Sequence, residues 1–276
     1  MRSSERPGTA ASGAFDRAAT ALSLAFLGGL FLDGWAHSHG RVDDSFFTPW
    51  HAVLYSAFLT LASLLVGRAA WGRARGRPRH AWLPEGYPLC LAGVALWLVG
   101  GPFDLAWHSV FGFEANVEAL LSPAHAVLAL GMALMTTGPL RARLRRPAGR
   151  WRDELPMVLS LTCLVLNLTF FMQIAHPVAN LWAAGRGWKS HALTEHGIVS
   201  MLLSTVIVIA PLLLLLRHER LPHGAVTIVV GLTCVASGFL YDQGAYPLAP
   251  VLAMAVGAAA ADGLRWALRP SPTRAG

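Results

Sequence analysis

Residues 18–37 read AATALSLAFLGGLFLDGWAH, a long apolar segment that indicates the fold class of this chain. It is twenty residues long and carries no charged residue before Asp33, near its end. Twenty residues rising 1.5 Å each form a helix of about 30 Å, the thickness of the hydrocarbon core of a bilayer. We therefore predict that this stretch is a transmembrane helix.

Further apolar runs of similar length follow it. Of the 276 residues, 54% are hydrophobic and 13% are charged, whereas about a quarter of a soluble domain is charged. We predict an all-α, polytopic transmembrane bundle of about eight helices. The expected spans are residues 18–37, 49–70, 87–108, 123–140, 156–176, 195–216, 225–242 and 247–268.

The basic residues are divided unequally between the two sides of these spans. Nineteen of the 22 lysine and arginine residues fall on one side, and only Arg41, Arg186 and Lys189 fall on the other. By the positive-inside rule the first side, with both termini, is cytoplasmic. The net charge of +7 therefore reflects orientation in a cell membrane, and we expect contact with the lipid bilayer and no nucleic-acid partner.

This orientation implies a simple division of the chain. We expect a cytoplasmic tail at residues 1–17, a single transmembrane domain at 18–268 and a second cytoplasmic tail at 269–276. The extracytoplasmic side holds eight of the eleven histidines.

Two predicted hairpins share a pattern of one aspartate and two histidines. The first helix of each ends in Asp-x3-His, and the second begins with Thr-Pro-x-His or Ser-Pro-x-His. The Asp and first His recur at an offset of 71 residues, and the later His recurs at 74. We interpret the chain as hairpin repeats over residues 18–70, 87–140, 156–216 and 225–268. The six residues of the pattern are Asp33, His37, His51, Asp104, His108 and His125.

The spacing within each hairpin predicts a metal site near the extracytoplasmic face. An Asp and a His four residues apart project from one face of a helix, one turn apart. If Thr48 and Ser122 are N-caps, the later His is the third residue of its helix, where the helix dipole disfavours its protonation. One carboxylate and two neutral imidazoles suit copper, iron or zinc, and leave a position for water or substrate.

The remaining hairpins carry weaker forms of the pattern. His176 and His196 occupy the two histidine positions of the third hairpin, where they are open to interpretation as ligands, supporting residues or remnants of duplication. Glu195, next to His196, is a further candidate. Asp242, at the end of the seventh span, fits a supporting or substrate-facing role better than a ligand role.

Three other interpretations stay open. The Asp and His residues can form an interhelical hydrogen-bond network without an ion, or they can relay protons or metal ions in a transporter or channel. Haem is a less favoured cofactor, with His51 and His125, or His176 and His196, as axial ligands, because it leaves the aspartates unexplained.

The pattern resembles the metal-binding helices of the C subunit of copper membrane monooxygenases, the particulate methane and ammonia oxidisers. That family carries one Asp-x3-His plus His set and one Asn-x3-His plus His set. Asp33, His37 and His51 would match the first set, and Asp104, His108 and His125 the second. Asp104 replaces the Asn, and the gap between His108 and His125 is longer than in the family.

This resemblance bears on the metal site more than on oxygenase activity. If the two ligand sets converge, their two aspartates and four histidines form a dinuclear centre able to activate oxygen or water, which predicts an oxidoreductase acting on a small apolar or lipidic substrate. If the sets stay apart, metal sensing, metal delivery or a structural role is favoured. The resemblance implies copper as the favoured metal. It also makes other membrane subunits candidate partners.

Overall fold

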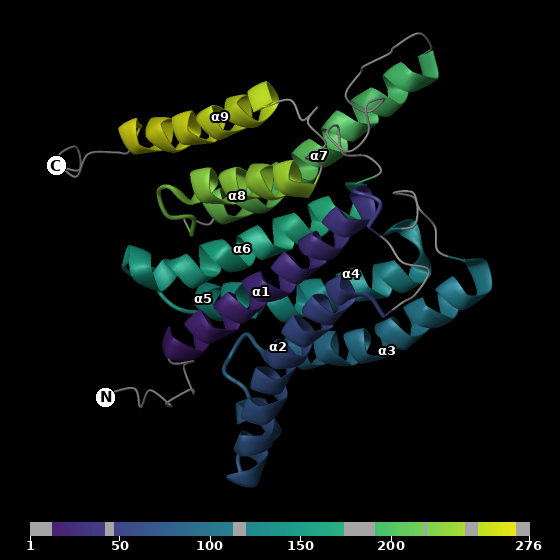
Figure 1. Cartoon of the computed structure of the whole chain (residues 1–276). Helices are drawn as coiled ribbons and strands as arrows, with labels where there is room; N and C mark the ends of the chain where they lie inside the picture. Colours follow the sequence, from purple (N-terminus) through teal and green to yellow (C-terminus); the bar gives the residue numbers. More distant parts are fainter. Residues whose placement is uncertain are drawn as a thin grey trace, which may run out of the picture. The chain divides into compact units, whose positions relative to one another are not determined.

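The computed structural model describes residues 13–41, 47–112, 120–173, 191–217, 220–240 and 248–268. For residues 191–194, 196 and 248–251 it describes the backbone only. Throughout these ranges the regular structure is helical and contains no strand, in agreement with the predicted all-α class (Figure 1). The chain forms two compact units, Met1–Ile174 and Ala175–Gly276, which we call unit 1 and unit 2.

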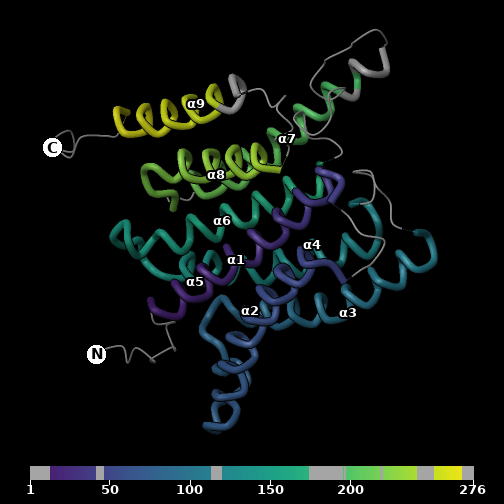
Figure 2. The backbone as a smooth tube through the Cα atoms, in the orientation of Figure 1, coloured from purple at the N-terminus to yellow at the C-terminus, as the bar shows by residue number. Residues whose placement is uncertain are grey.

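Unit 1 contains two helical hairpins, which Figure 2 allows the reader to follow along the chain. The first is formed by α1 and α2, the second by α3 and α4. A short helix α5 and the long helix α6 follow. Their bounds are α1 Gly13–Ser38, α2 Pro49–Ala74, the 3-10 turn η1 Arg79–Ala81, α3 Pro88–Phe111, α4 Pro123–Thr136, α5 Gly138–Leu144 and α6 Trp151–Phe171.

Proline determines where several of these helices begin. Pro49, Pro88 and Pro123 lie at the first helical position, where a missing N–H costs nothing. The predicted span 123–140 is divided into α4 and α5, whose axes differ by 43°. The division falls at Thr137, two residues before Pro139, because the proline ring clashes with the carbonyl of the preceding turn.

The first helix begins earlier than its apolar stretch suggested. α1 starts at Gly13, five residues before the expected span, and Asp16 in its first turn faces the positive end of the helix dipole. Asp16 is buried and bonds to Arg146 and Tyr87, so the first turn is anchored by residues distant in sequence. The expected boundary at residue 18 followed only the hydropathy.

The interior of unit 1 lies between its two hairpins and α6. α1 packs against α2 and α6, and α4 packs against α3 and α6. Phe26, Phe58 and Trp97 form an aromatic cluster with ring centroids 4.7 to 5.9 Å apart. All three are almost completely buried.

Five helices are long and apolar enough to cross a membrane among the residues that the structure describes. They are α1, α2, α3, α6 and residues Gly197–Arg217 of α7. The bent pair of α4 and α5 makes a sixth if it forms one span. Large apolar side chains such as Leu59, Val66, Leu98 and Val99 are exposed on α2 and α3, as expected for surfaces that face lipid. The predicted number of eight and the cytoplasmic side of the termini stay predictions.

Unit 2 contains α7 (His191–Arg217), α8 (Ala225–Leu240) and α9 (Leu248–Ala267). α8 and α9 pack against each other. Asp262 of α9 accepts hydrogen bonds from the backbone N–H and the hydroxyl of Thr227 and pairs with Arg265. These contacts connect the first turn of α8 to the last turns of α9.

Candidate metal centre

The first hairpin brings Asp33, His37 and His51 together, and we call this group site 1. One ligand atom from each residue lies within 4.8 Å of the other two. The Nε2 atoms of His37 and His51 lie 3.8 and 3.5 Å from Asp33 Oδ2. The three donors therefore surround a space that one ion could occupy.

The second hairpin repeats this arrangement with Asp104, His108 and His125, which we call site 2. The Nε2 atoms of His108 and His125 lie 3.6 and 3.5 Å from Asp104 Oδ1. The three ligand atoms again lie within 4.8 Å of one another. The structure thus groups the six residues as the sequence pattern predicted, with one carboxylate and two imidazoles in each hairpin.

Both carboxylates are buried, and each has an oxygen atom without a hydrogen bond. Asp33 is 9% exposed and Asp104 is 5% exposed. Neither Asp33 Oδ1 nor Asp104 Oδ1 accepts a hydrogen bond from any described residue. A buried carboxylate oxygen without a partner is costly, and a bound cation removes that cost. At site 2 this oxygen is the one that faces both imidazoles, whereas at site 1 the imidazoles face Oδ2. The donor sets of both sites, one carboxylate and two imidazoles, fit a metal ion.

The N-caps of α2 and α4 position the later histidine of each site. Thr48 Oγ1 accepts a hydrogen bond of 3.1 Å from the His51 backbone N–H, and Ser122 Oγ accepts one of 3.1 Å from that of His125. Each cap is followed by proline, so the histidine is the third residue of its helix. This confirms the predicted caps and the helix-start position of both histidines.

The Nδ1 atoms of both histidines of site 2 take part in hydrogen bonds, which fix the orientation of the imidazoles. His108 Nδ1 lies 3.2 Å from the Gly112 carbonyl oxygen, which can only accept a hydrogen bond. The proton of a neutral His108 therefore resides on Nδ1, and Nε2 keeps its lone pair. His125 Nδ1 lies 3.0 Å from the Ser122 hydroxyl. Such outer contacts are typical of imidazoles that bind metals.

The two sites are neighbours at the same end of unit 1. His37 of site 1 lies within electrostatic range of His108 and His125 of site 2. The ligands nevertheless form two separate groups, each built by one hairpin. The arrangement is therefore a pair of adjacent three-residue sites.

Sequence reasoning missed Tyr55 of α2, which lies near both sites. Its phenol is within electrostatic range of both Asp33 and Asp104. Its ring centroid lies 6.2 Å from that of His51 and 5.7 Å from that of Trp97. The available signal was its position one turn after His51, on the same helix face.

The other candidate residues belong to unit 2 or to segments outside the described residues. His176 and Asp242 lie outside the described residues. His196 lies in α7, where its side chain is not among those described, and Glu195 is exposed on the same helix. Their proposed roles stay predictions.

Comparison with known proteins identifies no relative: no family model, curated protein or solved structure matches the chain. The resemblance to the C subunit of copper membrane monooxygenases stays a prediction based on six residues.

Proposed function

We propose that this protein is an integral membrane metalloprotein that binds one transition-metal ion at each of sites 1 and 2. We further propose that it acts as an oxidoreductase on a small apolar or lipidic substrate, with copper the favoured metal. The observation that carries the proposal is the buried carboxylate faced by two imidazole Nε2 atoms, which occurs once in each hairpin.

The donor set determines which metals are suitable. Two imidazole nitrogens and one carboxylate oxygen suit copper, iron or zinc, whereas calcium and magnesium prefer more oxygen ligands. Three protein ligands leave a coordination position open to water, dioxygen or substrate. A copper or iron ion held there would supply electron transfer and activation of oxygen.

The position of the sites supports the proposed orientation. Sites 1 and 2 lie at the end of unit 1 where α1 and α3 finish and α2 and α4 begin. The arginine-rich segments 73–79 and 141–152 lie at the opposite helix ends, which the positive-inside rule assigns to the cytoplasm. We therefore propose that the sites face the extracytoplasmic side of a cell membrane.

Equivalent contacts in the two hairpins support our interpretation that they are copies. Phe26 and Trp97 each lie seven residues before the aspartate of their hairpin, and both are buried in the aromatic cluster. Leu54 and Leu128 each lie three residues after the later histidine and are also buried. Duplication of one hairpin would account for both the shared motif and the shared packing.

The aromatic cluster favours a closed metal site over a transport path. Phe26, Trp97 and Phe58 lie two helical turns, about 10 Å, farther into unit 1 than Asp33, Asp104 and His51. They are at most 2% exposed, and their rings contact one another. An ion leaving either site toward the other side of the membrane would have to displace this cluster.

The proposal can be tested by elemental analysis of the detergent-purified protein together with its absorption spectrum. We expect two equivalents of copper, iron or zinc in the wild type and loss of both in His37→Ala/His108→Ala. The control is His80→Ala, which replaces an exposed histidine outside both sites.

Each alternative gives a different result. Folded wild-type protein without metal would indicate a hydrogen-bond network, and a Soret band would indicate haem. Stoichiometric zinc would support the metal sites and contradict the redox activity, because zinc does not change oxidation state.

A further inference from the structure

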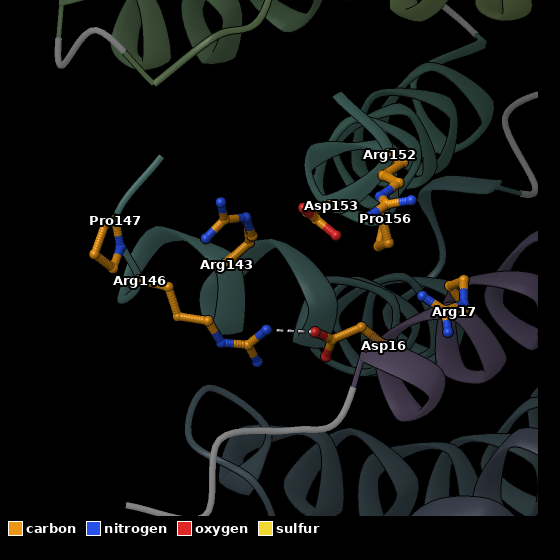
Figure 3. Close-up of a pocket in the computed structure, with 9 residues that line it drawn as sticks. Asp16, Arg17, Arg143, Arg146, Pro147, Arg152, Asp153 and Pro156 are labelled. Carbon is orange, nitrogen blue, oxygen red and sulfur yellow. Dashed lines mark hydrogen bonds and ion pairs between the residues drawn. The ribbon is translucent and has the colours of Figure 1, made fainter. Parts of the chain in front are cut away.

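A pocket of about 340 Å³ lies at the other end of unit 1 from the metal sites (Figure 3). Its walls come from the start of α1, from α5 and the turn after it, and from the start of α6. Asp16 of this pocket and Asp33 of site 1 are 17 residues apart on α1, which corresponds to about 25 Å. The pocket is therefore separate from the proposed metal centre.

Two ion pairs fix the walls of the pocket. Arg146 Nη1 lies 2.7 Å from Asp16 Oδ2, and Tyr87 donates a hydrogen bond of 2.8 Å to Asp16 Oδ1. Burial and the Asp16 carboxylate raise the pKa of Tyr87, so the phenol keeps its proton and donates it to this bond. Arg143 pairs with Glu154, and both side chains are at most 7% exposed. The pocket therefore has a defined shape before any ligand binds.

Two further arginines line the pocket without an ion pair to any described residue, namely Arg17 and Arg152. Figure 3 shows them on one side of the pocket, with Arg143 and Arg146 on the other. The pocket is lined by four arginines and two aspartates, and Glu154, the partner of Arg143, adds a third carboxylate. The pocket thus keeps a positive net charge.

The chemistry of the lining selects a phosphate group. Guanidinium groups bind phosphate oxygens through paired N–H donors. The first turns of α1 and α6 also line the pocket, and the positive ends of their helix dipoles attract an anion. The volume lies within the roughly 300–1,000 Å³ of small-molecule sites.

We propose that this pocket binds the phosphate group of an anionic phospholipid between Arg17, Arg146 and Arg152. The apolar helices of unit 1 place their ends at the level of lipid headgroups, and basic pockets between such helices bind anionic headgroups. A zwitterionic headgroup binds less well, because the net positive charge of the pocket repels its ammonium group. The inference does not depend on the metal sites.

The test compares phospholipid binding to the full-length protein in detergent by native mass spectrometry. The probes are phosphatidylglycerol, phosphatidylcholine and inorganic phosphate at millimolar concentration. The pocket variant is Arg17→Gln/Arg152→Gln. The matched control, Arg73→Gln/Arg79→Gln, removes the same charge from exposed arginines at the end of α2 and in η1, outside the pocket.

We expect the wild type and the control to bind phosphatidylglycerol alike and in preference to phosphatidylcholine. The pocket variant should bind phosphatidylglycerol roughly 25-fold more weakly, at about fivefold per arginine. Arg152→Lys keeps the charge but loses the planar guanidinium group. Its affinity for phosphatidylglycerol should lie between those of the wild type and the pocket variant. Equal melting temperatures will show that all variants are folded.

Two results would overturn the proposal. Equal losses in the pocket variant and the control would mean that lipid binding reflects general surface charge. If the wild type binds inorganic phosphate but shows no preference for phosphatidylglycerol over phosphatidylcholine, the pocket holds a free anion and not a lipid headgroup.

Discussion

Gly29 of α1 lies directly against the backbone of Leu54 in α2. A Cβ atom at position 29 would come within 2.8 Å of Leu54 Cα, which is too close for a real side chain. Gly29 is one turn before Asp33, and Leu54 is three residues after His51. This contact therefore sets the separation of the two helices that build site 1. Gly100 has the equivalent position near site 2, but there the added atom would meet a side chain and not the backbone, at 2.7 Å from Leu128 Cδ2.

Replacing this glycine should separate the helices and weaken site 1. We expect Gly29→Ala to destabilise the protein by about 1–3 kcal/mol, as overpacking in a core does. The metal of site 1 should be lost before that of site 2. Thermal unfolding and metal analysis will measure both effects. The control is Gly28→Ala on the same helix, where no atom lies within 4 Å of an added Cβ. Equal behaviour of the two variants would contradict this role of the close contact.

Removing one aspartate should abolish metal binding at its own site and leave the other site occupied. Asp33→Ala and Asp104→Ala should each lose one of two metal equivalents, because each carboxylate belongs to one site. Elemental analysis will measure the loss, with Glu85→Gln as an exposed control.

The same variants distinguish a metal site from a hydrogen-bond network. Without metal, Asp104→Ala should melt no lower than the metal-free wild type, because it removes a buried carboxylate that lacks a hydrogen bond on Oδ1. When metal is added, the wild type should gain more stability than Asp104→Ala, because this variant keeps only site 1. A lower melting temperature of the metal-free variant would favour the network.

Local rules of helix geometry made much of site 1 and site 2 predictable. Asp-x3-His fixes one turn of a helix, and Thr48-Pro49 or Ser122-Pro123 fixes the start of the next, whatever surrounds them. Because each site is built within a single hairpin, few contacts between distant residues were needed to predict its ligands.

The features that were not predicted depend on packing between hairpins. Tyr55 has no counterpart in the second hairpin, where Ala129 stands at the same offset of 74, so the repeat pattern gave no reason to select it. The start of α1 at Gly13 depends on Asp16 bonding to Arg146, a residue 130 positions away. Hydropathy along the chain carries no information about such a pair.

The N-cap of α4 should contribute to both stability and metal affinity. Ser122→Ala removes the acceptor for the His125 N–H and the contact with His125 Nδ1. We expect a loss of about 1 kcal/mol of stability and a roughly 10–100-fold weaker affinity of site 2 for metal. Ser122→Thr should retain both, since Thr48 performs the same capping in α2. Thermal unfolding and metal titration of both variants will show whether the hydroxyl contributes to stability and to the metal affinity of site 2.

Two arginine–carboxylate pairs at the basic end of unit 1 should differ greatly in their contribution to stability. Arg143 and Glu154 are at most 7% exposed, whereas Arg145 and Glu85 are 57% and 68% exposed. Arg143→Met would leave the Glu154 carboxylate buried without its cation, at a cost of about 3–5 kcal/mol. Arg145→Met should cost about 0–1 kcal/mol, because water and salt screen an exposed pair.

A second substitution can show that the buried charge causes this loss. Glu154→Gln removes the charge but keeps an acceptor for the Gly149 N–H, which bonds to Glu154 Oε1. Adding it to Arg143→Met should therefore recover most of the lost stability in thermal unfolding. If the double variant is no more stable than Arg143→Met, the loss arises from the missing packing of the arginine side chain, and not from an unpaired carboxylate.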